Sequence, residues 1–266
     1  MGILQDRVAL VTGASRGIGK AIAKAFVDAG AKVAICGRDG EAARKAADDI
    51  SPGGGRVLAF RADVADKAEV RDLLRDLVAR WGSIHILVNN AGMNARIPIE
   101  SEDDGRWLQV LLVNVVGAYY VTRETLRHMP GQSASDVREP GGRIINISSI
   151  LGKFGVPGYT AYCTAKHGII GLTRALALEV APRGITVNAI CPGWTETAMA
   201  DQGMEETAAI LGLSKAEFRR QALEAVPIKR ILDPREIADL ALYLASDASS
   251  GMTGQAINLD GGQVMY

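Results

Sequence analysis

The sequence predicts an α/β protein with one domain over residues 1–266, in which helices flank a doubly wound sheet of seven parallel strands. Two observations lead to this prediction. Seven short apolar stretches alternate with segments whose apolar residues recur every three or four positions. The 30 glycines exceed the ordinary share of about 7%, which indicates many tight strand-to-helix turns.

Composition excludes several classes of function. The formal net charge is +0 with acids and bases interspersed, which argues against a nucleic-acid or polybasic membrane surface. The N-terminal MGILQDR lacks the apolar run of a signal peptide, and no stretch is long and apolar enough to span a membrane. Cys36, Cys163 and Cys191 lie in apolar segments and are interpreted as reduced packing residues of a cytoplasmic protein. The three histidines are scattered, and neither His-x-x-x-His nor Cys-x-x-Cys occurs, so no metal site is expected.

The first predicted strand, residues 7–11, runs into TGASRGIG at 12–19, and a helical pattern follows as far as Gly30. Gly13, Gly17 and Gly19 have the spacing G-x-x-x-G-x-G. Glycine lets the backbone approach a pyrophosphate, and the helix N-terminus then faces the anion. The alternative is a glycine-rich turn without a ligand, and the strand and helix on either side favour the dinucleotide site.

The second strand, residues 32–36, ends at Gly37-Arg38 and precedes a helix over 39–50. An NAD site generally has an acidic residue here for the ribose 2′-hydroxyl. Arg38, together with Arg16 in the glycine loop, instead suits a 2′-phosphate, which guanidinium groups bind bidentately. NADP(H) is therefore favoured over NAD(H). The alternative is two solvated surface arginines.

The third strand, residues 56–60, precedes Asp63-Val64, and a helix is predicted over 68–81. Asp63 suits an exocyclic adenine amine, with the Val64 backbone framing the ring, unless Asp63 caps the helix that begins near Asp66. The fourth strand, residues 84–88, runs into Asn89-Asn90-Ala91-Gly92. In open α/β sheets the ligand crevice lies at this carboxyl edge.

One long helix is predicted over 104–128, with Asn114 among apolar residues in its interior. A buried asparagine is costly unless its amide is hydrogen-bonded. It is either a structural cross-link to a neighbouring strand or an amide that holds a water near the site, and both interpretations stay open. The polar segment 130–142 is predicted to be a surface loop and not a domain boundary.

The fifth strand, residues 143–147, leads through Ser149 into a helix over 160–181. Tyr162 and Lys166 lie four residues apart, hence on one face of that helix. A phenol has an ordinary pKa near 10, and a neighbouring ammonium favours the phenolate. With Ser149 holding a carbonyl oxygen, these groups suit the interconversion of a ketone and an alcohol. Taken alone, the pair is equally compatible with an exposed helix pair.

The sixth strand, residues 185–190, ends in CPGWTET, and a helical pattern follows over 199–226. Gly203, Gly212 and several apolar residues in that pattern predict a substrate lid at about 194–228, called the lid below. A helix over 234–245 and a strand over 256–259 complete the chain.

These motifs together resemble the short-chain dehydrogenase/reductase family. TGASRGIG, NNAG at 89–92, Asn114, Ser149, Tyr162-x-x-x-Lys166 and PGWTET at 192–197 occur in that family's order and spacing, across essentially the whole chain. The segments GGRIINISS, AKHGIIGLTRALALE and GITVNAICPG most resemble β-ketoacyl carrier-protein reductases and aromatic-polyketide ketoreductases. The fold implied is the Rossmann type. The 130–142 loop departs from the family, which has a shorter connection there.

The resemblance implies four catalytic residues. Tyr162 would donate the proton, Lys166 would hold the nicotinamide ribose and lower the tyrosine pKa, Ser149 would orient the carbonyl and Asn114 would hold a relay water. The family's spacing to the tyrosine selects Ser149 over Ser148. The resemblance also implies a homotetramer that pairs through the two long helices and the last strand.

The implied cofactor contacts follow the dinucleotide from end to end. The phosphates would lie against Gly13, Ser15, Arg16, Gly17, Ile18 and Gly19, with Arg38 at the 2′-phosphate. Asp63 and Val64 would contact the adenine and Asn90, Ala91 and Gly92 the adenine-side ribose. The nicotinamide carboxamide would lie against Pro192, Gly193, Thr195 and Thr197.

The predicted function is therefore an oxidoreductase that transfers hydride between NADP(H) and a ketone or secondary alcohol, with Tyr162 as general acid/base. A 3-oxoacyl thioester, a polyketide, a steroid, a sugar and a small cyclic ketone all stay open as substrates, and the lack of a basic patch favours a free small molecule over a carrier protein. Trp194, Met199, Met204 and Phe154 are proposed as pocket walls or as plain core. The competing hypotheses are an NAD-dependent secondary alcohol dehydrogenase, a catalytically silent dinucleotide sensor and an S-adenosylmethionine-dependent transferase. The last would want an acidic residue where Gly37-Arg38 stands.

Overall fold

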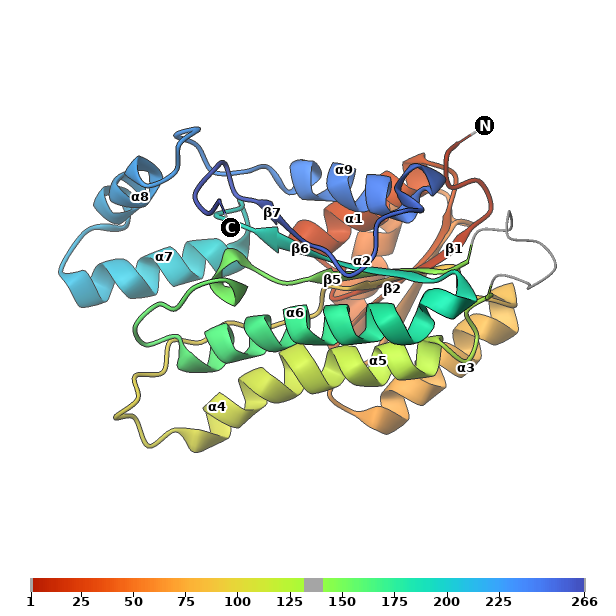
Figure 1. The fold of residues 1–266 in the computed structure, drawn as a ribbon, viewed down its shortest axis with the longest axis horizontal. Helices are drawn as coiled ribbons and strands as arrows, with labels where there is room; N and C mark the ends of the chain where they lie inside the picture. The colour runs from red at the N-terminus through yellow and green to blue at the C-terminus, as the bar shows by residue number, and fades with distance from the viewer. Residues whose placement is uncertain (1, 132–140, 266) are drawn as a thin grey trace.

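The computed structural model describes residues 2–131 and 141–265 and contains one seven-stranded sheet (Figure 1). The strand order is β3-β2-β1-β4-β5-β6-β7, and every neighbouring pair is parallel. The strands are β1 Val8–Thr12, β2 Lys32–Gly37, β3 Val57–Arg61, β4 Ile86–Asn89, β5 Arg143–Ile147, β6 Thr186–Pro192 and β7 Ala256–Leu259. The predicted doubly wound α/β fold is confirmed.

The central strands are apolar runs because both of their faces are covered. All residues of β1, β4, β5 and β6 are buried, as expected for a parallel sheet between two helical layers. β1, β4 and β6 extend one or two residues further toward their carboxyl ends than the apolar pattern predicts. At two of these ends a polar residue continues the strand: the Thr12 hydroxyl accepts hydrogen bonds from backbone N–H groups of the loop after β4, and the Asn89 amide donates to β5.

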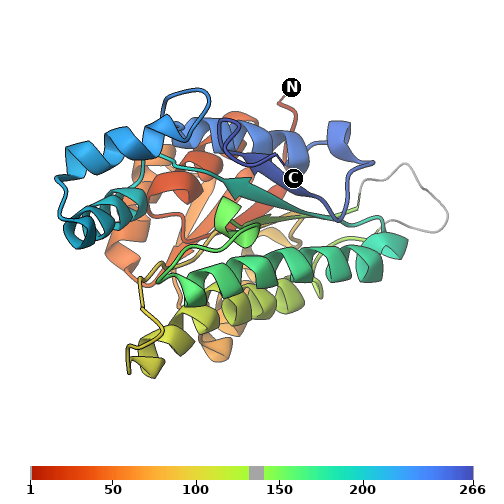
Figure 2. The ribbon, with the colours of Figure 1, turned by 60° about the vertical axis from the view of Figure 1, so that its left-hand side comes forward.

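Helices cover the two faces of the sheet (Figure 2). One layer contains α1 Gly17–Asp28, α2 Gly40–Ile50 and α9 Pro234–Ala245, and the other contains α3 Lys67–Trp81, α5 Gly117–Thr125 and α6 Thr160–Val180. Successive residues of β1 supply the two cores: Val11 belongs to the same apolar cluster as Phe26 of α1, and Leu10 to the same cluster as Leu74 of α3. Short 3₁₀ helices span Ile150–Gly152, Ala181–Arg183 and Asp247–Ser249.

The helix predicted over 104–128 is not one regular helix. It consists of α4 Asp104–Leu111, a π-helical turn Leu112–Val116, and α5, which ends at Thr125. Asn114 lies in the middle of the π turn, and its Nδ2 donates to the carbonyls of Val110 and Met93, at 2.8 Å each. Single π turns inside α-helices often occur at functional sites.

The helical pattern over 199–226 also divides in two. α7 Ala198–Leu211 ends at Gly212, whose φ of +67° favours glycine, and Ser214 caps α8 Lys215–Glu224. Both helices lie beyond the carboxyl edge of the sheet (Figure 1). Of the predicted loop 130–142, residues 132–140 lie outside the described part of the chain. Within the described ranges, no helix combines the length and apolar character needed to cross a membrane.

Candidate active site

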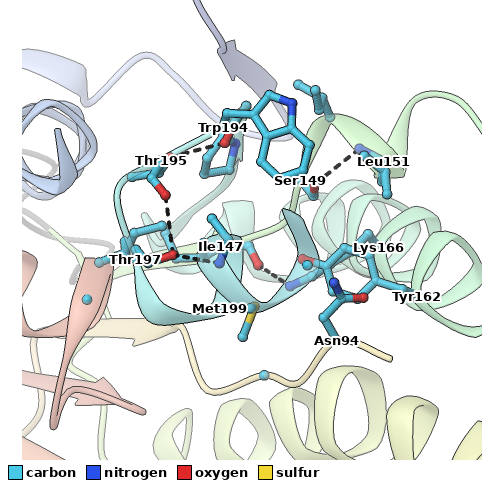
Figure 3. A pocket seen from close by; sticks show the side chains of 18 of the residues that line it. Asn94, Ile147, Ser149, Leu151, Tyr162, Lys166, Trp194, Thr195, Thr197 and Met199 are labelled. Atoms are coloured by element: carbon cyan, nitrogen blue, oxygen red, sulfur yellow. Dashed lines mark hydrogen bonds between the residues drawn. The ribbon is translucent and has the colours of Figure 1, made fainter. Parts of the chain in front are cut away.

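A cavity of about 570 Å³ opens at the carboxyl ends of the strands, under α7 (Figure 3). The strand order reverses between β1 and β4, which is where open α/β sheets bind ligands. The predicted site residues that line the cavity are Gly13, Arg16, Gly17, Ile18, Asn90, Gly92, Asn114, Ser149, Tyr162, Lys166, Pro192, Gly193, Thr195 and Thr197. Those that do not line it are Ser15, Gly19, Arg38, Asp63, Val64 and Ala91.

Glycine is required for different structural reasons at the three positions of the first loop. Gly13 has a φ of +64°, and an ideal Cβ there would lie 2.7 Å from the Cα of Ala91. A Cβ on Gly19 would lie 2.4 Å from Nδ2 of Asn90, which donates to the Thr12 and Gly13 carbonyls. These two glycines therefore let the first loop pack against the loop after β4. Gly17, with a φ of +57°, is the one of the three whose backbone starts helix α1 at the cavity wall.

Helix α1 begins without a side-chain hydrogen bond to its first N–H groups, since its N-cap is the exposed Arg16. Unpaired N–H groups at a helix N-terminus carry partial positive charge and bind anions. With Gly13, Gly17 and Ile18 beside them, they fit a pyrophosphate.

Lys166 and Tyr162 lie on one face of α6, as predicted. The Lys166 Nζ lies 5.4 Å from the centroid of the Tyr162 ring and donates to the Ile147 carbonyl at 2.8 Å. Ser148 and Ser149 both line the cavity, but the Ser148 hydroxyl donates to the Lys166 carbonyl at 2.9 Å. The Ser149 Oγ accepts from Leu151 N at 3.1 Å.

Burial controls the protonation of both α6 side chains. It raises the pKa of Tyr162 to about 12, opposed by a hydrogen bond with Ser149. It lowers the pKa of Lys166 to about 8, opposed by Cys191. The predicted lowering of the tyrosine pKa by Lys166 is therefore not seen in the protein alone, where loss of solvation is the largest influence on this pKa. The phenol is therefore protonated at neutral pH.

Asn114 makes a structural cross-link, to the segment after β4, and the water-holding interpretation stays a prediction. Its Nδ2 cross-links Met93 to the π turn, while its Oδ1 is buried without a hydrogen-bond partner among the described residues. An ideal Cβ on Gly92 would lie 2.6 Å from that oxygen. Gly92, which lines the cavity, therefore lies directly against an acceptor that has no donor among the described residues.

We expect Gly92→Ala to displace the Asn114 amide and to lower kcat by about tenfold, with a loss of unfolding free energy of about 1–3 kcal/mol from overpacking. The matched control is Gly105→Ala in α4, where a Cβ would meet only Asp103 at 4.0 Å. Steady-state kinetics and thermal unfolding of both variants check this, and equal kcat values for the two would contradict it.

The residues predicted to hold the adenosine half lie at the ends of β2 and β3. Arg38 is exposed, and the Gly37 before it lies against Ser15, with an ideal Cβ 3.6 Å from Ser15 Oγ. Asp63 does not cap the next helix: Asp66 does, and Asp63 accepts from Ala65 N instead. Val64 packs against Gly117.

An aromatic pair and an ion pair connect segments within the lid, and a polar pair links α7 of the lid to the body of the protein. Trp194 meets Phe218 of α8 edge to face, with ring centroids 6.4 Å apart, and Arg219 pairs with Glu196. The Tyr159 hydroxyl lies 3.3 Å from Thr207 Oγ1 of α7. Trp194, Met199 and Phe154 line the cavity as predicted. Met204 does not line it and is 1% exposed, so it is core.

Several polar cavity residues are not predicted as site residues from the sequence, among them Asn94, Tyr159 and Gln263. Asn94 lies two positions after the end of NNAG, and Tyr159 lies three positions before Tyr162. Their closeness to these motifs is the sequence signal that could have identified them. Gln263 follows Asp260-Gly261-Gly262 and reaches the site only through the fold. Across residues 2–131 and 141–265, no group of three or more His, Cys, Asp or Glu could hold a metal ion.

A family model described as enoyl-(acyl carrier protein) reductase matches residues 13–263. Together with the fold and the relatives below, this match shows that the chain belongs to the short-chain dehydrogenase/reductase family and is an oxidoreductase.

Comparison with individual relatives indicates which type of oxidoreductase the chain is. The chain is 40% identical over 265 residues to the granaticin polyketide synthase putative ketoacyl reductase 1 of Streptomyces violaceoruber, covering 100% of this chain and 96% of the relative. It is 39% identical over 262 residues to a 3-oxoacyl-[acyl-carrier-protein] reductase of Chlamydia trachomatis, covering 98% of each. A solved variant of actinorhodin polyketide ketoreductase with NADPH superposes with a TM-score of 0.90 at 37% identity, covering 98% of both chains. The protein is an oxidoreductase of the ketoacyl- and polyketide-reductase type.

Proposed function

We propose that this protein is an NADPH-dependent ketoreductase that converts a carbonyl of a small molecule to a secondary alcohol, with Tyr162 as the proton donor. The observation that carries the proposal is the protonated Tyr162 phenol beside Ser149 in the cavity. The NADPH bound by the actinorhodin relative supports the choice of cofactor.

The chain's own groups would work in sequence on the carbonyl oxygen. Bound NADPH supplies the hydride. Ser149 and Tyr162 hydrogen-bond the oxygen where negative charge develops, and Tyr162 gives it a proton. Lys166 holds positive charge beside the phenol, and the unpartnered Asn114 Oδ1 holds a water through which the phenol regains its proton. The cavity under α7 excludes bulk water.

Arg38 and Arg16 would select the phosphorylated cofactor. Both are exposed arginines beside the glycine loop, and Arg38 follows the carboxyl end of β2. We expect Arg38→Asp to lower the NADPH-over-NADH preference by at least about 100-fold. The carboxylate would repel a 2′-phosphate and accept from a 2′-hydroxyl. The ratio of kcat/KM for the two cofactors checks this.

Arg71→Asp in α3 is the matched control, since Arg71 is exposed and distant in sequence from the glycine loop. An unchanged ratio in Arg38→Asp, or an equal change in the control, would mean that Arg38 is not the selector.

The assembly proposed is a homotetramer. Leu108 and Leu112 on the α4–π segment, Tyr119 on α5 and Leu178 on α6 are large apolar side chains that are exposed in the single chain, and pairing of these helices would cover them. Tyr243 and Met265 are exposed near the C-terminal end of the fold. The buried, unpaired cysteines support a cytoplasmic location.

The decisive experiment follows nicotinamide absorbance with NADPH and NADH over a panel of ketones and acyl thioesters. Turnover that prefers NADPH supports the proposal. Turnover with NADH alone would instead make the protein an NAD-dependent alcohol dehydrogenase of the same family.

A further inference from the structure

Three amide side chains that line the cavity have a buried carbonyl oxygen with no hydrogen-bond partner among the described residues. They belong to Asn94, Asn114 and Gln263. A buried acceptor without a donor is costly, and native proteins leave few of them. The proposed relay water accounts for the oxygen of Asn114 and leaves the other two unexplained.

Of the two remaining amides, we consider that of Asn94, which lies near the catalytic side chains proposed above. It lies in the segment after β4, and its amide end points into the cavity toward Tyr162 (Figure 3). Its Nδ2 lies 3.7 Å from an ideal Cβ on Gly203, so this side of the amide faces α7. A molecule whose carbonyl meets Ser149 and Tyr162 would therefore extend past the Asn94 oxygen under the lid.

The remaining walls define the kind of molecule that fits there. Leu151, Phe154, Trp194, Met199 and Phe218 are apolar and line the same cavity, whose volume of about 570 Å³ suits a ring system of two or three rings. The donor that Asn94 accepts from is expected to be neutral, because Lys166 would repel an ammonium group in the same cavity, where the carboxylate of Glu196 is already paired with Arg219. A hydroxyl group meets these conditions.

We propose that Asn94 determines substrate specificity by accepting a hydrogen bond from a hydroxyl on a cyclic ketone, so that the substrate class is hydroxylated ring ketones. This inference rests on the proposed function for the identity of the carbonyl-binding end. A site that hydrogen-bonds a hydroxyl discriminates strongly against the analogue that lacks it.

The test uses ligands that bind without reacting. Calorimetry on the full chain would compare the dihydroxynaphthalene isomers, in which one hydroxyl occupies the carbonyl position, with their hydroxy-methoxy analogues, which keep the oxygen but lose one donor. We expect at least one isomer to bind about tenfold more tightly than its methoxy analogue. In Asn94→Leu this preference should disappear, whereas Gln263→Leu should retain it.

Thermal unfolding verifies that Asn94→Leu is folded, and Asn94→Ala serves as a second variant that removes the amide without adding bulk. No preference for a hydroxyl in any isomer would overturn the proposal, and so would a preference that both Asn94 variants keep or that only Gln263→Leu removes. Because binding is measured without turnover, failure to reduce any ketone would count against the proposed function and leave this assignment standing.

Discussion

Tyr162→Phe is expected to bind NADPH about as tightly as the wild type and to lose turnover by about 1,000-fold. The change removes one oxygen atom from a side chain that is otherwise enclosed, so the helix and cavity walls keep their packing. It removes the only group proposed to hand a proton to the nascent alkoxide, and general acid catalysis contributes roughly 100- to 10,000-fold. Single-turnover kinetics and cofactor titration by fluorescence measure the two quantities separately.

Tyr159→Phe is the matched control for this prediction. Tyr159 lines the same cavity and lies one turn before Tyr162, but its hydroxyl faces Thr207 of α7. We expect its effect on turnover to be well below that of Tyr162→Phe. Near-wild-type turnover in Tyr162→Phe would rule out the proton-donor role.

Lys166→Met is expected to lower turnover by at least about 100-fold and to change how stability depends on pH. The ammonium is buried, and its pKa falls from 10.5 to about 8 in the folded protein. Between these values the unfolded chain binds more protons than the folded one, so this group makes the unfolding free energy rise with pH. From pH 8 to pH 10 the unfolding free energy of the wild type should therefore rise by about 2 kcal/mol relative to that of Lys166→Met. Taking this difference cancels the opposite contribution of the buried Cys36 thiol, whose pKa is raised from 9.0 to about 12 and which both proteins contain.

Denaturant titrations at several pH values up to 10 measure this slope. Above pH 10 the raised pKa of Tyr162, about 12, acts in the opposite direction, because the folded protein then binds the extra proton. Lys67→Met, at an exposed position in α3, should keep the wild-type slope. Equal slopes in Lys166→Met and the wild type would show that the buried lysine is not desolvated as described.

The sequence predicts the sheet well because each central strand is buried on both faces and therefore leaves an apolar signal. It predicts the Ser149–Tyr162–Lys166 constellation because these residues lie on one strand end and one helix. What it misses depends on contacts between distant segments. Gly19 fits against Asn90 only because the sheet places β1 beside β4. Gln263 reaches the cavity only because β7 ends at the same edge of the assembled sheet.

Contacts between distant segments also explain why the sequence predicts a lowered pKa for Tyr162, whereas the pKa is raised in the protein without cofactor. Spacing on a helix shows that a lysine is near, but not that the walls from other elements remove water from both groups. The end of α7 at Gly212 is missed for another reason. The glycine itself is a local sign of a helix end, but the helical apolar pattern continues on both sides of it, so the sequence suggests one helix.

The π turn at 112–116 also sets the rotational phase between the two helices that it joins. α4 packs on α6, whereas α5 packs on α3 and β4. Each residue of an α-helix turns the chain by roughly 100°, so a one-residue change in length here would rotate α5 relative to α4 by about a quarter of a turn or more. The inward position of Asn114 and the change of packing partner are thus produced by the same local geometry. A single-residue deletion in this segment would therefore have two effects at once. It would move the Asn114 amide out of the cavity, and it would turn the apolar face of α5 away from the sheet.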